Sequence, residues 1–142
     1  MSRLLGLDIG KRRIGVALSD ETQTIAKGLE AVDGTAKKEP AIRRIADICA
    51  ENDVSEIVAG LPLNMDGSEG PAAKEVLGFV ELLSQELSVP ILTYDERLST
   101  KQGEAILIKA DMSRSKRKKT IDRFAAQIIL QAYLDQKRSE EL

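Results

Sequence analysis

The order in which short apolar runs and amphipathic stretches follow one another constrains the fold of this chain most. Residues 3–9 and 13–18 are apolar runs separated by Gly10-Lys11-Arg12, which predicts a β-hairpin. A weaker run over residues 24–32 precedes the turn-forming pair Asp33-Gly34 and predicts a third strand. The chain is therefore expected to open with three antiparallel strands.

The rest of the chain alternates helical and extended patterns. Apolar side chains at helical spacing predict helices over residues 39–52, 71–87 and 99–110 and from Thr120 onward, and apolar runs predict strands over residues 56–61 and 89–94. Ser99 with Gln102 three residues later resembles a capping box. The two later strands are separated by helices and must run parallel. We therefore expect one α/β domain over residues 1–142, with a five-stranded mixed sheet flanked by helices and residues 136–142 as a frayed tail.

The composition excludes several kinds of chemistry. The chain has no histidine, so it cannot form a His-dependent triad or a Cys/His zinc site, and its single cysteine cannot form an internal disulfide. Its four aromatic residues are too few for a base-stacking platform. No apolar run approaches the roughly 20 residues that span a bilayer, and no secretory segment follows Met1, so we expect a cytoplasmic protein without a membrane partner.

Three acidic residues occupy positions typical of an active site. Asp8 interrupts an apolar strand just before a turn, where burying an unpaired carboxylate would be costly. Asp95 and Glu96 follow a predicted strand at its carboxyl end, where open α/β sheets place their sites. Asp122 falls in the first turn of the last predicted helix. Because the strands before Asp8 and Glu96 end at the same edge of the predicted sheet, these two side chains are expected to approach each other.

Each acid also has a structural interpretation. Asp8 could cap the turn or pair with a basic residue of the hairpin, Arg97 could neutralise the acids beside it, and Asp122 could stabilise a helix start. Three carboxylates without histidine suit Mg²⁺ or Mn²⁺ better than zinc. Two such ions about 3.5–4 Å apart can support phosphodiester hydrolysis. We therefore expect Asp8, Glu96 and Asp122 to bind metal and act in catalysis, with Arg97 or Lys101 stabilising the transition state.

Two further segments are candidates for substrate binding. Residues 113–119 hold five of the 21 basic residues of the chain, which are Arg114, Lys116, Arg117, Lys118 and Lys119. We expect a basic loop that brings a polyanion to the acidic site through phosphate contacts, with a solvated loop without a partner as the alternative. Residues 60–67 predict a tight loop whose Asn64 approaches a phosphate, or an ordinary turn before a helix.

Taken together, these residues resemble the YqgF family, also called RuvX, of pre-16S rRNA nucleases and Holliday-junction-resolvase-like proteins. The resemblance covers nearly the whole chain and rests on GLDIG at residues 6–10, RIGVA at 13–17, GLPLNMDG at 60–67, DERLST at 95–100 and ID at 121–122. It implies an RNase H-like fold. It also implies that Asp8, Glu96 and Asp122 are the acidic metal-binding triad of the family.

The resemblance implies a metal-dependent endonuclease that processes the 5′ end of pre-16S rRNA in ribosome biogenesis, with nucleic acid and a ribosomal particle as partners. A resolvase acting on branched DNA is an alternative, and a two-fold junction would favour a symmetric dimer. An rRNA- or ribosome-binding factor without catalysis is an alternative of another class. Residues 7–10 also resemble the phosphate-binding opening of actin-like and sugar-kinase ATPases, but those folds need a second domain.

Overall fold

The computed structural model describes residues 2–34 and 38–141. Within these residues the chain forms β1 (Arg3–Ile9), β2 (Arg13–Ser19), β3 (Ala26–Asp33), α1 (Lys38–Glu51), β4 (Val54–Leu61), α2 (Pro71–Glu86), β5 (Ile91–Asp95), α3 (Glu96–Lys109), α4 (Arg114–Arg123) and α5 (Ala125–Glu141). The strands form one sheet in the order β3-β2-β1-β4-β5. Pairing is antiparallel across β1, β2 and β3 and parallel across β1, β4 and β5, as the sequence predicts.

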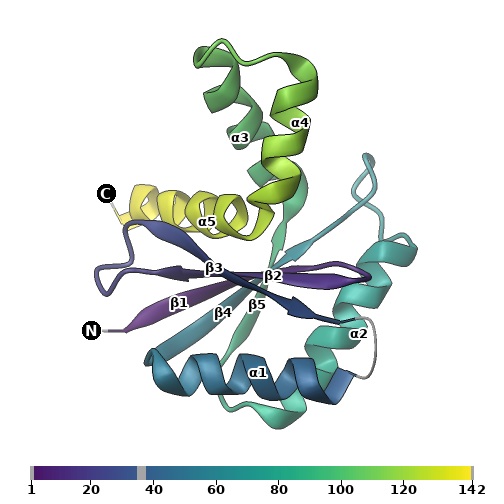
Figure 1. Ribbon diagram of the computed structural model, residues 1–142, viewed down its shortest axis with the longest axis vertical. Helices are drawn as coiled ribbons and strands as arrows, with labels where there is room; N and C mark the ends of the chain where they lie inside the picture. The colour runs from purple at the N-terminus through teal and green to yellow at the C-terminus, as the bar shows by residue number, and fades with distance from the viewer. Residues whose placement is uncertain (1, 35–37, 142) are drawn as a thin grey trace.

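Helices cover both faces of the sheet. Figure 1 shows α1 and α2 on one face and α5 on the other, while α3 and α4 form a hairpin that projects away from the sheet. Successive side chains along β1 point to opposite faces of the sheet. Leu5 and Leu7 join the core under α1 and α2, whereas Leu4 joins the core under α5. Asp8 has the same parity as Leu4 and therefore lies on the α5 face.

Helix α5 packs directly against the backbone of β1. A Cβ atom on Gly6 would lie 2.8 Å from Leu130 Cβ and 3.1 Å from the carbonyl oxygen of Ala126, so only glycine permits this close approach. The contact brings the first turn of α5 next to the carboxyl end of β1. It thereby places the bend between α4 and α5 beside Asp8.

Helix α3 begins one turn earlier than the sequence predicts. Asp95 is its N-cap, because its side chain accepts a hydrogen bond of 2.9 Å from the Arg97 backbone N–H. Ser99 is therefore inside the helix, where its buried hydroxyl donates to the Glu96 carbonyl at 3.1 Å. The predicted capping box at Ser99 is wrong, because Asp95, at the end of β5, caps the helix before Ser99 is reached. The strands β3 and β5 each begin two residues later than predicted.

The basic segment is a helix and not a loop. Ser113 caps α4, which holds the basic residues, and the helix ends at Arg123. Phe124 separates it from α5, so the single helix predicted from Thr120 is two helices. The prediction failed because α4 contains no buried residue and therefore has no apolar periodicity, although Lys and Arg favour helix. Helix α5 continues through residues 136–141, which were expected to fray, and residue 142 lies outside the described residues.

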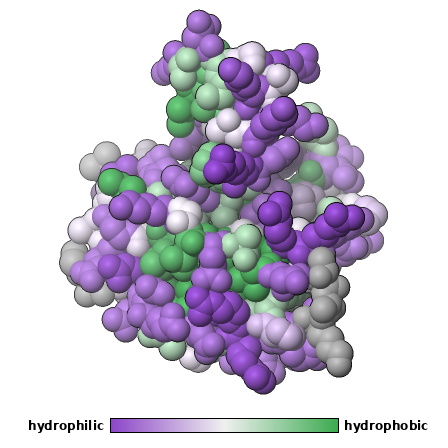
Figure 2. Space-filling model, in the orientation of Figure 1, coloured by the Kyte–Doolittle hydropathy of each residue, from purple (hydrophilic) through white to green (hydrophobic). Residues whose placement is uncertain are grey.

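The surface of the projecting hairpin differs between its two helices. In Figure 2 hydrophilic side chains gather along α4, and a hydrophobic patch lies along α3. The exposed side chains of α3 include Ile106 and Ile108. No helix in the described part of the chain is long and apolar enough to cross a membrane.

Candidate active site

Asp8 and Glu96 meet at one edge of the sheet. Asp8 lies near the carboxyl end of β1, and Glu96 is the first residue of α3, directly after β5. Both strands run parallel to β4, so their carboxyl ends lie at the same edge. The two carboxyl groups share a side-chain hydrogen bond. The expected approach of these two acids is therefore confirmed.

Gly60 makes room for this pair. It lies on β4, between β1, which carries Asp8, and β5, which ends just before Glu96. A Cβ atom on Gly60 would lie 2.5 Å from Glu96 Oε1 and 2.5 Å from Ile129 Cδ1. The Glu96 carboxyl therefore lies over the bare backbone of β4, beneath α5. A strand glycine that admits a close neighbour is a signal that the sequence analysis did not use.

Burial makes this pair easier to protonate. Desolvation raises the pKa of Asp8, and the negative charge of Asp122 raises it further, against the lowering effect of the hydrogen bond from Glu96. Desolvation raises the pKa of Glu96 to about 7, and the charge of Asp8 adds to the increase. The carboxyl pair therefore holds a proton near neutral pH, with Glu96 as the donor to Asp8.

Asp122 stands near the pair but apart from it. It is exposed, and it lies in the last turn of α4 rather than in the first turn of a helix, so that sequence prediction is wrong. A helix dipole disfavours an acid at this end, which removes the structural explanation offered by the sequence. Among the described residues, no group of three Asp, Glu or Cys side chains is close enough to hold a metal ion. The structure thus brings two of the three predicted acids into contact.

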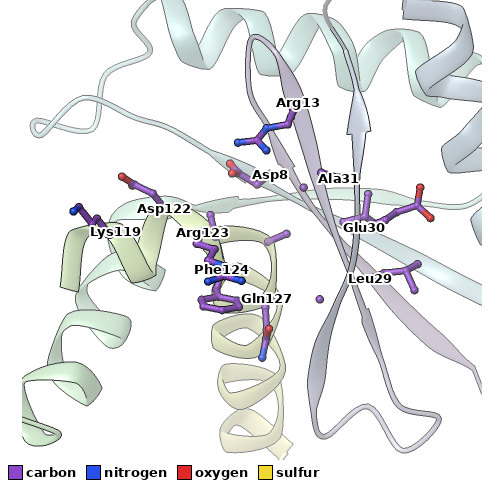
Figure 3. Close-up of a pocket in the computed structure, with 15 residues that line it drawn as sticks. Asp8, Arg13, Leu29, Glu30, Ala31, Lys119, Asp122, Arg123, Phe124 and Gln127 are labelled. Carbon is purple, nitrogen blue, oxygen red and sulfur yellow. The ribbon is translucent and has the colours of Figure 1, made fainter. Parts of the chain in front are cut away.

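Two cavities open beside the acids. The smaller, of about 290 Å³, lies between α3 and the α4–α5 bend, and its lining includes Asp8, Glu96, Ser99 and Asp122. The larger, which we call the strand groove, has about 900 Å³ and runs between the β2–β3 surface and the bend. Asp8 and Asp122 lie at one end of the strand groove in Figure 3. The acids are therefore accessible to a large ligand.

Basic side chains line the strand groove next to the acids. Of the predicted substrate-binding residues, Lys119 lines it together with Asp8 and Asp122. Arg13 of β2 and Arg123 of α4 also line it, although the sequence analysis did not select them for substrate binding (Figure 3). The run of basic residues ended at Lys119, and only the bend after α4 shows that Arg123 faces the same groove.

Three of the predicted substrate-binding residues make internal contacts. The Arg97 guanidinium donates to Asp95 at 2.7 Å and to the Met65 carbonyl at 3.1 Å, which ties the loop after β4 to the start of α3. Arg117 pairs with Glu104 of α3 at 2.9 Å and donates to the Met112 carbonyl, and the Asn64 amide donates to Ser68 Oγ at 3.0 Å. These contacts stabilise loops and the hairpin. The remaining residues, Lys101, Arg114, Lys116 and Lys118, are exposed on α3 and α4.

The donor set suits a hard divalent cation. Asp8 and Glu96 are half-buried carboxyl groups, and neither forms an ion pair with a basic residue in the part of the chain that the structure describes. The hydrogen bond between the two carboxyl groups requires a proton. When both groups ionise, their negative charges need a positive charge beside them, which a cation would supply. Oxygen ligands of this kind are the ones that Mg²⁺ and Mn²⁺ prefer.

Comparison with known proteins agrees with this geometry. A family model described as "RuvX: Holliday junction resolvase" matches residues 2–136. The chain belongs to the RuvX family. Curated relatives include a protein of Thermoanaerobacter pseudethanolicus, 46% identical over 97% of this chain and 99% of the relative, and one of Desulforamulus reducens, 48% identical over 94% and 96%. Both carry the provisional name pre-16S rRNA nuclease.

The solved structures show the fold of this RuvX protein. T. thermophilus RuvC in complex with a Holliday junction substrate superposes with a TM-score of 0.64 at 14% identity, covering 99% of this chain and 97% of RuvC. A second RuvC structure from Thermus thermophilus gives 0.51 at 17% identity, covering 72% and 69%. The predicted family and the predicted RNase H-like fold are confirmed. Membership in a nuclease family also supports the predicted enzyme class, a phosphodiester hydrolase.

Proposed function

We propose that this RuvX protein is an endonuclease that processes the 5′ end of pre-16S rRNA in the cytoplasm, with a divalent metal ion as its cofactor. The observation that carries the proposal is the Asp8–Glu96 pair, which lies over Gly60 at the sheet edge and opens to a groove lined by basic residues. Relatives 46% and 48% identical carry the name pre-16S rRNA nuclease, which supports this choice of substrate.

Asp8 and Glu96, with Asp122 in the lining of the same cavity, are the residues that would hold Mg²⁺ or Mn²⁺, and we propose two ions. When bound, such an ion supplies Lewis-acid stabilisation of the charge that develops on the reacting phosphate. Glu96 must first lose the proton that it donates to Asp8, since a protonated carboxyl is a poor ligand. The protein contribution is thus a pair of carboxylates whose ionisation at neutral pH is coupled to ion binding.

Substrate binding is proposed for the basic residues around the acids. A cluster of carboxylates repels a polyanion, so phosphate contacts must offset this repulsion. Lys119 lines the groove beside Asp8 and Asp122, and Arg13 and Arg123 line it from β2 and α4. We propose that these three side chains bind the backbone near the cleaved bond, whereas Lys116 and Lys118 on α4 extend the contact away from it. Lys101 of α3 remains the proposed residue for transition-state stabilisation, and Arg97 fixes the loop after β4.

Two observations favour other functions. The description of the family model favours cleavage of Holliday junctions in branched DNA. The distance of Asp122 from the carboxyl pair favours a binding factor without catalysis, because among the described residues no three acids form a metal-binding cluster.

A substrate comparison separates these functions. Purified protein is treated with EDTA, supplied again with Mg²⁺ or Mn²⁺, and incubated with a small-subunit rRNA precursor and with a four-way DNA junction. The Asp8→Asn variant, purified identically, reveals contaminating nucleases. Asp47→Asn is the matched control, because Asp47 is exposed on α1 across the sheet from the acids. We expect metal-dependent cleavage of the precursor by the wild type and by Asp47→Asn, and loss of cleavage in Asp8→Asn.

Other outcomes would change the assignment. Cleavage of the junction but not of the precursor would establish the resolvase activity. Salt-sensitive binding of either substrate that Asp8→Asn retains, without cleavage by any variant, would establish the binding factor and contradict the proposed nuclease.

A further inference from the structure

Phe124 exposes an aromatic ring at the bend between α4 and α5. Its side chain is 42% exposed, which is unusual for a phenylalanine. The ring lines the strand groove and also a smaller apolar cavity of about 250 Å³ between α3 and α5. In Figure 3 it lies farther along the groove than the acids, next to Gln127. The ring is therefore accessible to a ligand whose backbone passes the acids.

The bend itself does not require this ring. The backbone N–H of Phe124 donates to the Thr120 carbonyl at 3.0 Å, and its carbonyl accepts from the Ile128 backbone N–H at 2.9 Å. Phe124 has φ −111° and ψ 24°, which any residue can adopt. The main chain thus satisfies its own hydrogen bonds at the bend. An exposed phenylalanine ring at this position contributes little to the stability of the fold. The ring is therefore available for binding.

Neighbouring side chains supply the other contacts that a nucleotide needs. The Arg123 guanidinium lies 5.2 Å from the centroid of the Phe124 ring, in a cation–π contact that holds a positive charge at the groove. The Gln127 side chain lines both cavities and has no hydrogen-bond partner within residues 2–34 and 38–141. Gly28 lies opposite, since a Cβ atom there would be 3.6 Å from Gln127 Oε1. The Gln127 amide therefore lies in the groove, close to the backbone of β3 at Gly28, where a ligand in the groove can reach it.

We propose that Phe124 stacks on the base of one unpaired nucleotide of the substrate, while the Gln127 amide binds the edge of that base and Arg123 binds an adjacent phosphate. A paired base inside a helix has both faces covered, so this site selects single-stranded or locally unpaired nucleic acid. A platform of several rings is excluded by the four aromatic residues, and one ring accepts one base. The inference rests on the proposed function in one respect, which is that the acids mark where the backbone of the nucleic acid lies.

The test measures binding, so that it does not depend on cleavage. A short single-stranded RNA carries 2-aminopurine, a fluorescent base that stacking quenches, at one position in each of a series of oligonucleotides. Binding is measured in EDTA, and gel electrophoresis verifies that the RNA stays intact. We compare wild type with Phe124→Ala, with Phe124→Tyr, which keeps a ring, and with Ile108→Ala, which removes another exposed apolar side chain of the hairpin. Thermal unfolding verifies that each variant is folded.

The proposal makes a specific prediction for this series. Stacking of a base on an aromatic ring is worth about 1–3 kcal/mol, so Phe124→Ala should weaken binding by roughly 5- to 150-fold. Phe124→Tyr and Ile108→Ala should bind like the wild type. One labelled position should be quenched by the wild type and not by Phe124→Ala, and an abasic residue at that position should weaken binding by the wild type much more than binding by Phe124→Ala.

Equal binding by Phe124→Ala and wild type would overturn the proposal, and so would an abasic effect that is as large in Phe124→Ala as in the wild type. These results are independent of the proposed function. A wild type that cleaves RNA without the ring effect would leave the nuclease standing and remove the base site. Weaker binding by Phe124→Ala, found in a protein that never cleaves RNA, would support the base site and contradict the nuclease.

Discussion

The carboxyl pair and the basic helix α4 belong to the same edge of the molecule, yet they are built in opposite ways. Asp8 and Glu96 are half-buried and fixed by the sheet, by Gly60 and by each other. Helix α4 has no buried residue, and its Arg117 forms an ion pair with Glu104 of α3. Packing therefore positions the carboxyl pair, whereas most of the basic side chains of α4 are exposed to solvent.

The largest effect is expected from Glu96→Gln, which removes one carboxylate but keeps the shape of the side chain. Loss of a metal-binding carboxylate costs several kcal/mol of transition-state stabilisation, so single-turnover cleavage should fall by at least about 100-fold. The variant should unfold at no lower temperature than the metal-free wild type, because a neutral amide is easier to bury here than an ionised carboxylate. Retained cleavage would show that the pair is structural.

The next effect is expected from Gly60→Ala. The new Cβ would overlap the Glu96 carboxyl and Ile129 Cδ1, so it should displace the carboxyl, lower cleavage by roughly 10- to 100-fold and cost about 1–3 kcal/mol of stability. Gly78→Ala in α2 is the matched control, because a Cβ there meets nothing within 4 Å. That control should keep full activity and gain about 0.5–1 kcal/mol. Equal behaviour of the two variants would contradict the close packing described for β4.

A smaller effect is expected from Lys116→Ala with Lys118→Ala on α4. Both side chains are exposed, so the melting temperature should stay unchanged. Affinity for RNA should fall, and the slope of log affinity against log salt should become shallower by about 0.7 for each phosphate that the variant no longer binds. Lys27→Ala with Lys38→Ala, also exposed but outside α4, should leave the slope unchanged. A slope that changes equally in both double variants would mean that α4 makes no particular contact.

The smallest effect is expected in the pH dependence of stability without metal. The pKa of Glu96 rises from its ordinary 4.5 to about 7 on folding, and the pKa of Asp8 also rises, so the native state binds more protons than the unfolded state across that interval. The free energy of unfolding should therefore fall as pH increases from 4.5 to 7. Thermal unfolding in EDTA measures this, and Glu96→Gln should reduce the slope. An unchanged slope in Glu96→Gln would mean that other groups cause it.

The sequence was informative where burial leaves a pattern. The three antiparallel strands, the two parallel strands and the approach of Asp8 to Glu96 were predicted from apolar runs and the acids that follow them, and these predictions are confirmed. The sequence analysis failed for α4, because a helix without a buried residue shows no hydrophobic period. It also placed Asp122 in the wrong turn, and the ring of Phe124 became visible only once the bend after α4 was known.

The most direct test of the central claim is a calorimetric titration of the metal-free protein with Mn²⁺ near neutral pH. The account predicts saturable binding by the wild type and by Asp47→Asn, release of protons on binding as Glu96 ionises, and loss of binding in Asp8→Asn. Binding by Asp8→Asn as strong as that of the wild type, or no binding by the wild type, would contradict the claim that the Asp8–Glu96 pair is the metal-binding centre of this nuclease.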